Sequence, residues 1–392
     1  MGSRNTNSGP LACVMGDMDL VRPLGKSGVR CAVVSERDSP SRFSRFASAW
    51  IEALDPSDRP EALVQRLVDF GLAQARPPVL FYQTDGDLLL VSRYRERLGE
   101  AFRFVVPERS LVEDLVDKER FRALAETLDL PVPKSSRLDP ARDSTPSPKE
   151  LAFPLIVKPL PTRTAIWSRI DTGKALKVEG PDALAALWPR LAEAGIEVLA
   201  QELIPGPETR IESYHAYIDD GGAIRGEFTG VKIRTKPVEY GYTTALETTG
   251  NRVVRDLGRQ LVERLSLRGA AKLDFKRTPN GELRLLEINP RFTLWAHPGA
   301  LAGVNLPALV YADLTGHPHP GRVEARAGVS WCAPLQDLSA ARAWGVPLRR
   351  WLPWALRCEA KSNVGWDDPG PLVGSLLRRR PTLSIRQAIA LT

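Results

Sequence analysis

The sequence has few residues of the types that build disulfide, zinc or membrane-spanning structures. Its four cysteines and four histidines among 392 residues form no Cys-x-x-Cys pair and no metal-ligand spacing, which argues against a zinc site or a disulfide scaffold. No apolar run approaches the roughly 18 to 20 residues that cross a bilayer. We therefore expect a soluble cytoplasmic protein that has reduced structural thiols and makes no contact with a membrane. These thiols belong to Cys13, Cys31, Cys332 and Cys358.

A large excess of positive or negative charge is missing as well. Lysine and arginine number 54 against 47 acidic residues, a net charge of +7, and the excess is spread along the chain without a basic tract, so we predict no nucleic-acid partner. A modest positive excess suits an enzyme with anionic ligands, because a positive cleft raises their local concentration. A dinucleotide fingerprint is also missing, since no G-x-G-x-x-G follows Gly16, and no nicotinamide cofactor is predicted.

The first third of the chain alternates between apolar runs and helical patterns. Apolar runs at residues 11–16, 29–35 and 78–83 have the length of buried strands. Their alternation with helices predicts a parallel β-α-β sheet. The helical patterns cover residues 20–26, 61–72, 87–98 and 111–128.

From residue 153 onwards, strands separated by turns replace this alternation. The mixture predicts antiparallel sheets with covering helices, an α+β arrangement. Residues 134–149, rich in Ser, Pro, Asp and Arg, are interpreted as a surface connection before it. The predicted strands are 154–158, 175–178, 198–203, 211–218, 225–233, 271–277 and 282–288, and the predicted helices are 181–194 and 251–267.

Two of these strands form a hairpin with oxygen-bearing side chains. Asp274 ends one strand, and Glu287 and Asn289 end the next, with the turn at residues 278–281 between them. Pairing brings Asp274 close to Glu287, and the period of two places Glu287 and Asn289 on one face. Such oxygen ligands suit Mg²⁺ completed by nucleotide phosphates. A solvated polar hairpin face is the alternative for the same residues.

Several cations are placed where they could meet phosphate groups. Lys158 ends an apolar strand, although a lone lysine there more often reaches solvent. Lys118 near the start of its helix opposes the helix dipole unless an anion lies beside it. Lys232, Arg234 and Lys236 alternate along a strand, and three cations on one face favour a bound polyanion.

A strand-to-turn segment offers a place for a nucleoside. The strand at residues 199–204 runs into Pro205-Gly206-Pro207, and Glu208 follows. Exposed backbone groups after a strand can bind an adenine edge, and a nearby carboxylate can hold ribose hydroxyls. An ordinary turn explains the same residues.

Taken together and in this order, residues 110–315 resemble the ATP-grasp superfamily of carboxylate–amine ligases. The step of thirteen residues from Asp274 to Glu287, followed by Asn289, matches the magnesium motif of D-alanine–D-alanine ligases. The resemblance implies ATP and Mg²⁺, with Mn²⁺ as a substitute. Lys272 stands where those ligases carry an arginine facing the phosphates, and Arg291 is similar to an arginine that stabilises developing negative charge. These two residues are the catalytic candidates.

The same resemblance assigns the nucleotide contacts. Lys118 and Lys158 would hold phosphates, and Glu208 would hold ribose. Lys174 would supply a contact that relatives obtain from a glycine-rich loop, which residues 160–173 replace here with a Pro-, Thr- and Arg-containing segment. The adenine hinge would be formed by Gln201, Glu202, Leu203 and Ile204, and Lys232 and Arg234 complete the predicted ATP-binding residues.

The resemblance also implies an activity and a division of the chain. The activity is ATP-dependent amide formation through an acyl phosphate, on a small amino-acid or natural-product carboxylate and an amine. The resemblance also implies a homodimer. Phosphoryl transfer to an enol or hydroxyl, or ATP binding without catalysis, stays open as an alternative. Trp351 and Trp354 indicate packing on the core or a partner subunit. The expected parts are a disordered tail (1–10), an N-terminal α/β pre-ATP-grasp domain (11–133), a central lid subdomain (134–204), a C-terminal ATP-grasp subdomain (205–327) and an extension packing on the core (328–392).

Overall fold

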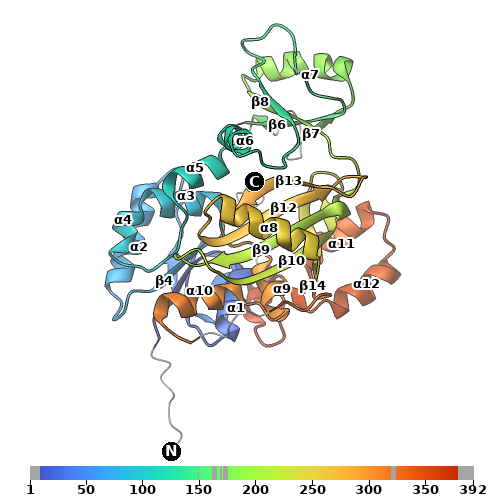
Figure 1. Cartoon of the computed structure of the whole chain (residues 1–392). Helices are drawn as coiled ribbons and strands as arrows, with labels where there is room; N and C mark the ends of the chain where they lie inside the picture. The colour runs from blue at the N-terminus through green and yellow to red at the C-terminus, as the bar shows by residue number, and fades with distance from the viewer. Residues whose placement is uncertain are drawn as a thin grey trace, which may run out of the picture.

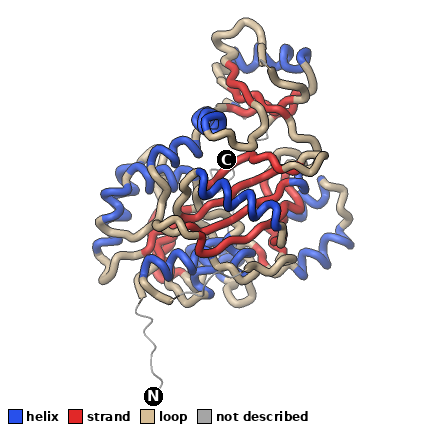
Figure 2. Tube along the Cα trace, in the orientation of Figure 1, coloured by secondary structure: helices blue, strands red, loops and turns tan. Residues whose placement is uncertain are grey.

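The computed structural model describes residues 9–148, 150–160, 166–167, 170, 175–318 and 324–377. Within these residues the chain forms three β-sheets. Figure 1 shows a parallel sheet with its helices on the left, a large sheet in the centre and a small sheet above it. Figure 2 shows that strands fill the interior of the main body and that helices surround them. The predicted combination of an α/β part with two antiparallel α+β parts is confirmed.

The N-terminal sheet is parallel, with the strand order β3-β2-β1-β4. Three of its strands are fully buried, as expected for a sheet covered on both faces. The edge strand β3 was not predicted from the sequence, because its partly exposed residues show no clear hydrophobic pattern. The strands are β1 (Ala12–Met15), β2 (Cys31–Ser35), β3 (Ala47–Glu52) and β4 (Val79–Tyr82). The helices are α1 (Met18–Lys26), α2 (Pro60–Leu72), α3 (Asp85–Arg93) and α4 (Arg95–Gly99), with the 3-10 turn η1 (Pro40–Phe43).

Two helices predicted as continuous are broken. The pattern at residues 87–98 is divided into α3 and α4, and that at 111–128 into α5 (Arg109–Val116) and α6 (Lys118–Thr127). At the second break Asp117 is extended, and its carboxylate accepts hydrogen bonds from the backbone N–H groups of Glu119 and Arg120. An aspartate that caps the next turn in this way competes with continuation of the helix. The break places Lys118 in the first turn of α6, facing the small sheet.

The small sheet is antiparallel, with the strand order β5-β8-β6-β7. Its strands are β5 (Ser135–Leu138), β6 (Leu155–Pro159), β7 (Leu176–Val178) and β8 (Val198–Glu202). Helix α7 (Pro181–Glu193) covers one face with Leu184, Leu187, Trp188 and Leu191. The interpretation of residues 134–149 as only a connection is wrong, because β5 lies within them. Its sequence Ser-Ser-Arg-Leu has little strand propensity, and pairing with β8 decides its conformation.

The large sheet has the strand order β13-β12-β9-β10-β11-β14-β15. The period of two sends Leu273 and Phe275 of β12 into the core beneath α8. Lys272 and Asp274 therefore face the opposite side of the sheet. The strands are β9 (Ile211–Ile218), β10 (Ile224–Lys236), β11 (Tyr242–Thr249), β12 (Gly269–Arg277), β13 (Leu283–Asn289), β14 (Ser330–Cys332) and β15 (Ala360–Lys361). The helices against them include α8 (Arg252–Arg264), α9 (Ala296–Leu301) and α10 (Leu306–Thr315).

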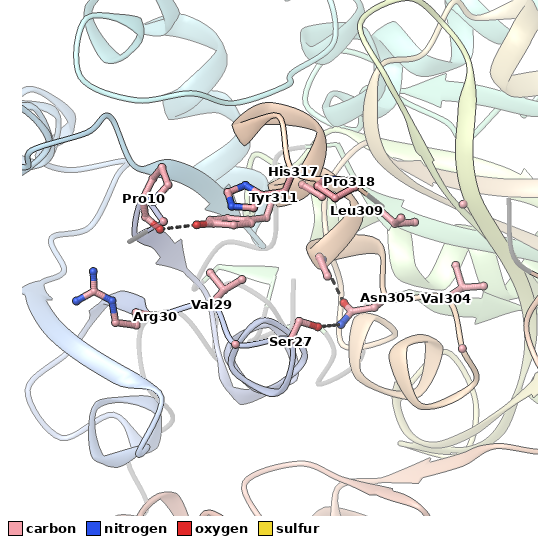
Figure 3. Close-up of a pocket in the computed structure, with 16 residues that line it drawn as sticks. Pro10, Ser27, Val29, Arg30, Val304, Asn305, Leu309, Tyr311, His317 and Pro318 are labelled. Carbon is pink, nitrogen blue, oxygen red and sulfur yellow. Dashed lines mark hydrogen bonds between the residues drawn. The ribbon is translucent and has the colours of Figure 1, made fainter. Parts of the chain in front are cut away.

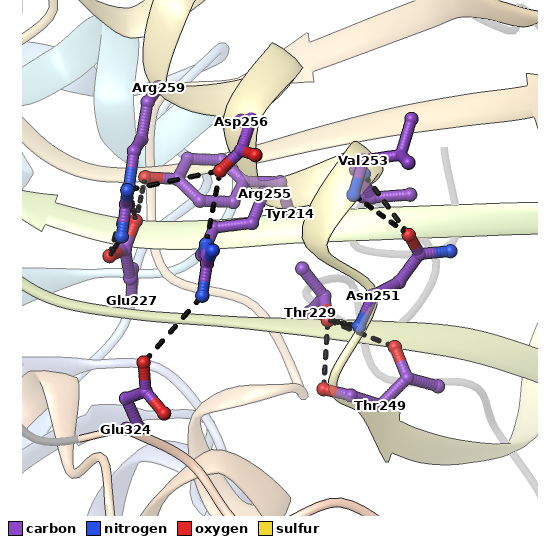
Figure 4. Close-up of polar contacts among 11 residues, drawn as sticks. Tyr214, Glu227, Thr229, Thr249, Asn251, Val253, Arg255, Asp256, Arg259 and Glu324 are labelled. Carbon is purple, nitrogen blue, oxygen red and sulfur yellow. Dashed lines mark hydrogen bonds and ion pairs between the residues drawn. The ribbon is translucent and has the colours of Figure 1, made fainter.

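A polar network fixes α8 to the sheet (Figure 4). Buried Glu227 of β10 accepts hydrogen bonds from the Arg259 side chain and, at 2.8 Å, from the Tyr214 hydroxyl. Asn251 caps α8 by accepting from the N–H groups of Val253 and Val254. These contacts satisfy the buried polar groups behind the sheet, and we assign them a structural role.

The described part of residues 328–392 belongs to the large sheet. Strand β14 pairs antiparallel with β11, and β15 pairs parallel with β14. Helices α11 (Pro334–Ala343) and α12 (Leu348–Arg357) lie at the far end of the sheet from the N-terminal domain (Figure 1). Helix α13 (Gly370–Leu377) contacts η1. The domain boundaries given above stay predictions, and of the predicted tail only Gly9 and Pro10 are described.

Candidate active site

The predicted metal hairpin forms with the expected pairing. Asp274 of β12 is directly opposite Glu287 of β13, and Lys272 is opposite Asn289. The Lys272 Nζ lies 2.6 Å from Asp274 Oδ2 and 3.4 Å from Glu287 Oε1. Asn289 Nδ2 donates to Glu287 Oε1 at 3.1 Å. The Lys272 ammonium therefore joins the two carboxylates, and Asn289 contacts one of them.

Asp274 is the buried centre of this group, with 1% of its surface exposed. Ser213 of β9 donates its hydroxyl hydrogen to Asp274 Oδ1, and Lys232 Nζ lies 3.4 Å from Oδ2. Burial alone would raise the pKa of Asp274, but the charges of Lys272 and Lys232 outweigh it and hold this pKa below its usual range. Burial likewise opposes the charge of Lys232, whereas Asp274 and Glu287 raise its pKa overall. Asp274 thus stays anionic at neutral pH.

This arrangement fits a divalent cation that is shared with a nucleotide. The described residues include no group of three or more His, Cys, Asp or Glu side chains able to hold a metal. The two carboxylates and the amide would fill only part of the coordination shell of the metal. Water and phosphate oxygens would fill the rest, as Mg²⁺ prefers. The Lys272 ammonium touches both carboxylates, which shows that Asp274 and Glu287 reach a common cation position.

Two lysines approach from the small-sheet side. Lys158 Nζ donates to Gln201 Oε1 at 2.8 Å, and Lys118 Nζ donates to the Pro159 carbonyl oxygen at 2.8 Å. Burial lowers the pKa of both lysines, and the charge of Glu287 acts in the opposite direction on each. A phosphate group between the two sheets would restore the charge that burial disfavours.

The lowered pKa of Lys118 leads to a prediction about how ATP affinity depends on pH. Burial, followed by the charge of Lys158, lowers its pKa to about 8. The free protein therefore loses this ammonium as the pH rises through that value, whereas a bound phosphate favours the protonated form. We expect ATP affinity, measured by calorimetry, to fall by up to about tenfold per pH unit above this pKa. The Lys118→Arg variant stays charged and should show a shallower fall; equal affinity of the unaltered protein across this range would contradict the assignment.

The predicted adenine and ribose segment lies beside these lysines. Leu203 N–H donates to the Pro154 carbonyl oxygen at 3.1 Å, and Glu202 accepts from the Ala152 N–H. Ile204 is half-buried in the following loop. Glu208, in the 3-10 turn η3 (Glu208–Arg210), is buried, with Lys276 Nζ 3.6 Å from its carboxylate. Sequence analysis missed Lys276, although its spacing of two from Asp274 indicated the same face. The nucleoside contacts stay predictions.

Arg234 is not available for a phosphate. The register between β10 and β11 shifts at Lys232/Arg234 and Arg234/Thr235, so the predicted shared face of Lys232, Arg234 and Lys236 is wrong. The Arg234 guanidinium instead donates to both oxygens of Asp337, at 2.9 and 2.6 Å, and lies over Trp354. Lys236 contacts Ser339. Lys174, the remaining predicted phosphate contact, lies outside the described residues.

Arg291 joins the hairpin to the N-terminal domain. Its guanidinium donates to Asn289 Oδ1 at 2.9 Å, to the Gln83 carbonyl oxygen at 3.0 Å and to Asp85 Oδ1. With a longer contact of 3.5 Å to the Phe292 carbonyl oxygen, these contacts orient the Asn289 amide and occupy four of the five N–H donors of the guanidinium. Asp85 and Gln83 were missed because contacts across about two hundred residues leave no local signal.

The Asp85 contact leads to a prediction about metal affinity. Replacing Asp85 by asparagine should loosen Arg291 and thereby the Asn289 amide. Loss of such a supporting contact weakens metal sites by about 10- to 100-fold, so we expect a comparable rise in the Mn²⁺ dissociation constant, followed by the paramagnetic signal of bound Mn²⁺. The surface variant Asp58→Asn, with 79% of its side chain exposed, is the matched control. Equal Mn²⁺ affinity in both variants would remove this role for Asp85.

A cavity of about 400 Å³ lies elsewhere (Figure 3). Its lining includes Val29 and Arg30 before β2, with Asn305 and Tyr311 from around α10. The residues before β2 lie at the amino edge of the parallel sheet, whereas ligands of such sheets bind at the carboxyl edge. None of the predicted site residues lines this cavity.

The chain is similar in sequence to a described family and to known ligases. Residues 197–333 match the family described as "ATP-grasp in the biosynthetic pathway with Ter operon". They include Gln201 and the whole acidic hairpin. A D-aspartate ligase of Enterococcus faecium is 25% identical over 346 residues, which are 84% of this chain and 79% of the relative. Both matches support an ATP-grasp ligase.

Two further similarities support this assignment. A D-alanine–D-alanine ligase of Ectopseudomonas mendocina is 27% identical over 188 residues, which are 44% of this chain and 55% of the relative. An N5-carboxyaminoimidazole synthetase of Staphylococcus aureus, complexed with ADP, shares the fold with a TM-score of 0.60 at 14% identity, covering 81% of this chain and 80% of that one. The predicted superfamily and the predicted ATP-grasp fold are confirmed. None of the described helices is both long and apolar enough to cross a membrane.

Proposed function

We propose that this ligase uses ATP to activate a carboxylate as an acyl phosphate and then joins it to an amine, releasing ADP and phosphate. The observation that carries the proposal is the convergence of Asp274, Glu287 and Asn289 with lysines from both sheets. Lys118 and Lys158 approach from one side, and Lys232 and Lys272 from the other. Four ammonium groups around two carboxylates suit a polyphosphate with its counter-ion.

The first step depends on positioning and charge neutralisation. Lys118 and Lys158 would hold the phosphates while a carboxylate oxygen of the substrate attacks the γ-phosphorus in line, and ADP leaves. Asp274, Glu287 and Asn289 would hold Mg²⁺, which would supply positive charge to the nucleotide phosphates. Lys272, which contacts both carboxylates, would contact the transferred phosphoryl group.

The second step forms the amide. The amine attacks the acyl carbon, its proton is released, and phosphate leaves. Lys272 lies on the hairpin itself and contacts both carboxylates, and we assign to it the main stabilisation of the tetrahedral oxyanion. Arg291 keeps one donor beyond its four contacts and would assist, but its contacts support mainly a role in orienting Asn289.

The relatives named as D-aspartate and D-alanine–D-alanine ligases favour a small amino acid as one substrate. Peptide-like or natural-product assembly agrees with the description of the matching family. We further propose a cytoplasmic location, where ATP is available, and a homodimer. The identities of the acid and the amine are left to experiment.

The test is ADP release from the full-length protein with paired libraries of amino acids and small carboxylic acids. We expect ADP only when both an acid and an amine are present, together with an amide product of matching mass. A phosphorylated product formed without any amine would replace the proposal with phosphoryl transfer to a hydroxyl or enol. Tight ATP binding without turnover across the libraries would replace it with an ATP-binding protein.

A further inference from the structure

Helix α12 exposes an apolar row on its outer side. Leu348, Leu352 and Leu356 follow one another at four-residue spacing and are 55%, 46% and 70% exposed. This spacing keeps them within about 80° of one face of the helix. Figure 1 places α12 at the outer edge of the molecule, beyond the end of the large sheet. The row therefore lies on a peripheral helix and is accessible to solvent.

The side of α12 next to the leucine row accounts for its attachment. Trp351 is buried and donates its indole N–H to Asp337 at 2.8 Å, and Ala355 is buried beside it. Trp354 is half-buried beneath the Arg234 guanidinium. These contacts hold the helix on α11 and the large sheet. The three leucines are thus not needed to anchor α12 among the described residues.

A basic row borders the apolar one. Arg349, Arg350 and Arg357 are exposed, and at about 100° per residue they fall on the arc next to the leucines. Helix α12 contains no acidic residue. Glu359, just after the helix, accepts hydrogen bonds from the N–H and hydroxyl of Ser330. The outward face therefore combines leucines with positive charge and lacks counter-charges of its own.

The neighbouring segments share this character. Twelve large apolar residues of the described chain are exposed, and eight of them lie between Leu335 and Leu376. Leu335 on the adjacent α11 is 78% exposed, and Trp366 is fully exposed. Leu335 thus adds an exposed leucine beside α12, whereas helix α13, which carries Leu372, Val373 and Leu376, lies against η1 of the N-terminal domain.

We propose, in contrast to the sequence-based expectation of no membrane contact, that the exposed leucine and arginine face of α12 docks on an anionic membrane surface. Leucines beside arginines form the side-chain set of interfacial helices, in which leucines enter the acyl boundary while arginines contact lipid phosphates. A second copy of the chain would bring these arginines together without acidic partners. A protein partner would need an acidic groove to receive a convex helix, whereas a lipid surface adapts to it. The contact is peripheral and does not depend on the proposed reaction.

The test is flotation of the full-length protein with vesicles made of equal parts phosphatidylcholine and phosphatidylglycerol. We expect binding that falls with added salt, and little binding to phosphatidylcholine alone. The combined variant Leu348→Ser, Leu352→Ser, Leu356→Ser should bind at least about tenfold less, because it removes most of the inserted apolar surface. The pair Arg349→Gln, Arg357→Gln should lose the preference for anionic vesicles.

The matched control is Leu72→Ser with Val253→Ser, two exposed apolar residues remote from α12, which should bind as the unaltered protein does. Unchanged thermal unfolding will show that the surface variants are folded. Absence of vesicle binding, or equal binding by the leucine variant, overturns the proposal. Light scattering that shows a dimer abolished by the same leucine substitutions would also overturn it, in favour of an interface between copies.

Discussion

Replacing Glu287 by glutamine is expected to lower kcat by about a thousandfold, because the change removes one of two metal-binding charges. Glu287 contacts Lys272 and Asn289, and its side chain is 54% exposed. Glutamine keeps its length, so the fold should not change. Initial rates of ADP release at saturating ATP, with an acid and amine pair that supports turnover, measure the effect.

Glu282→Gln is the control for this experiment. Glu282 borders the same hairpin, forms an exposed ion pair with Arg284 and has 63% of its side chain exposed. We expect full activity from this variant because an exposed pair contributes little. Activity of Glu287→Gln within a few-fold of the unaltered ligase would remove Glu287 from the metal site.

The Asp337→Asn variant is expected to lose about 3 to 5 kcal/mol of stability, the usual cost of leaving a buried charge without its partner. Asp337 is fully buried and accepts hydrogen bonds from Arg234, from the Thr244 hydroxyl at 2.8 Å and from Trp351. Asparagine keeps its shape but removes the charge opposite Arg234. Urea unfolding followed by tryptophan fluorescence measures the change.

A double variant tests the cause of this loss. Combining Arg234→Met with Asp337→Leu removes both charges, so the stability should recover in part relative to Asp337→Asn. Arg268→Met, which removes an arginine that bonds only backbone carbonyls, controls for loss of an arginine. If Asp337→Asn unfolds at the same urea concentration as the unaltered protein, the buried pair is not a major stabilising contact.

The hairpin was predictable because its signals are local. Asp274 and Glu287 lie on adjacent strands joined by a short turn, so the period of two and the turn position determine their pairing. Lys276 lies two residues after Asp274 and so shares its face of the strand, and the same rule could have added it to the predicted site residues. The N-terminal β-α-β unit was predictable because its signals are local too: its buried strands are continuous apolar runs.

The rest depended on contacts between distant residues or on irregular backbone. Ser213 reaches Asp274 through the pairing of β9 with β12, whose register no local pattern specifies. A β-bulge turns Arg234 away from the face on which the strand pattern places it. Its partner Asp337 is about a hundred residues away in the sequence. Asp117 divides a helix whose apolar periodicity is continuous. In each case a tertiary or capping interaction overrides a regular sequence pattern.

The position of β14 in the large sheet has a consequence for biosynthesis. Strand β11 is complete at Thr249, but Ala245, Leu246 and Glu247 receive their second neighbour only when residues 330–332 pair with them. On the ribosome, the body of the ligase therefore emerges with an open sheet edge, which is a template for pairing between nascent chains. We expect polypeptides terminated before Ser330 to aggregate, and chaperone binding during translation to be strongest in the interval between the synthesis of β11 and that of β14.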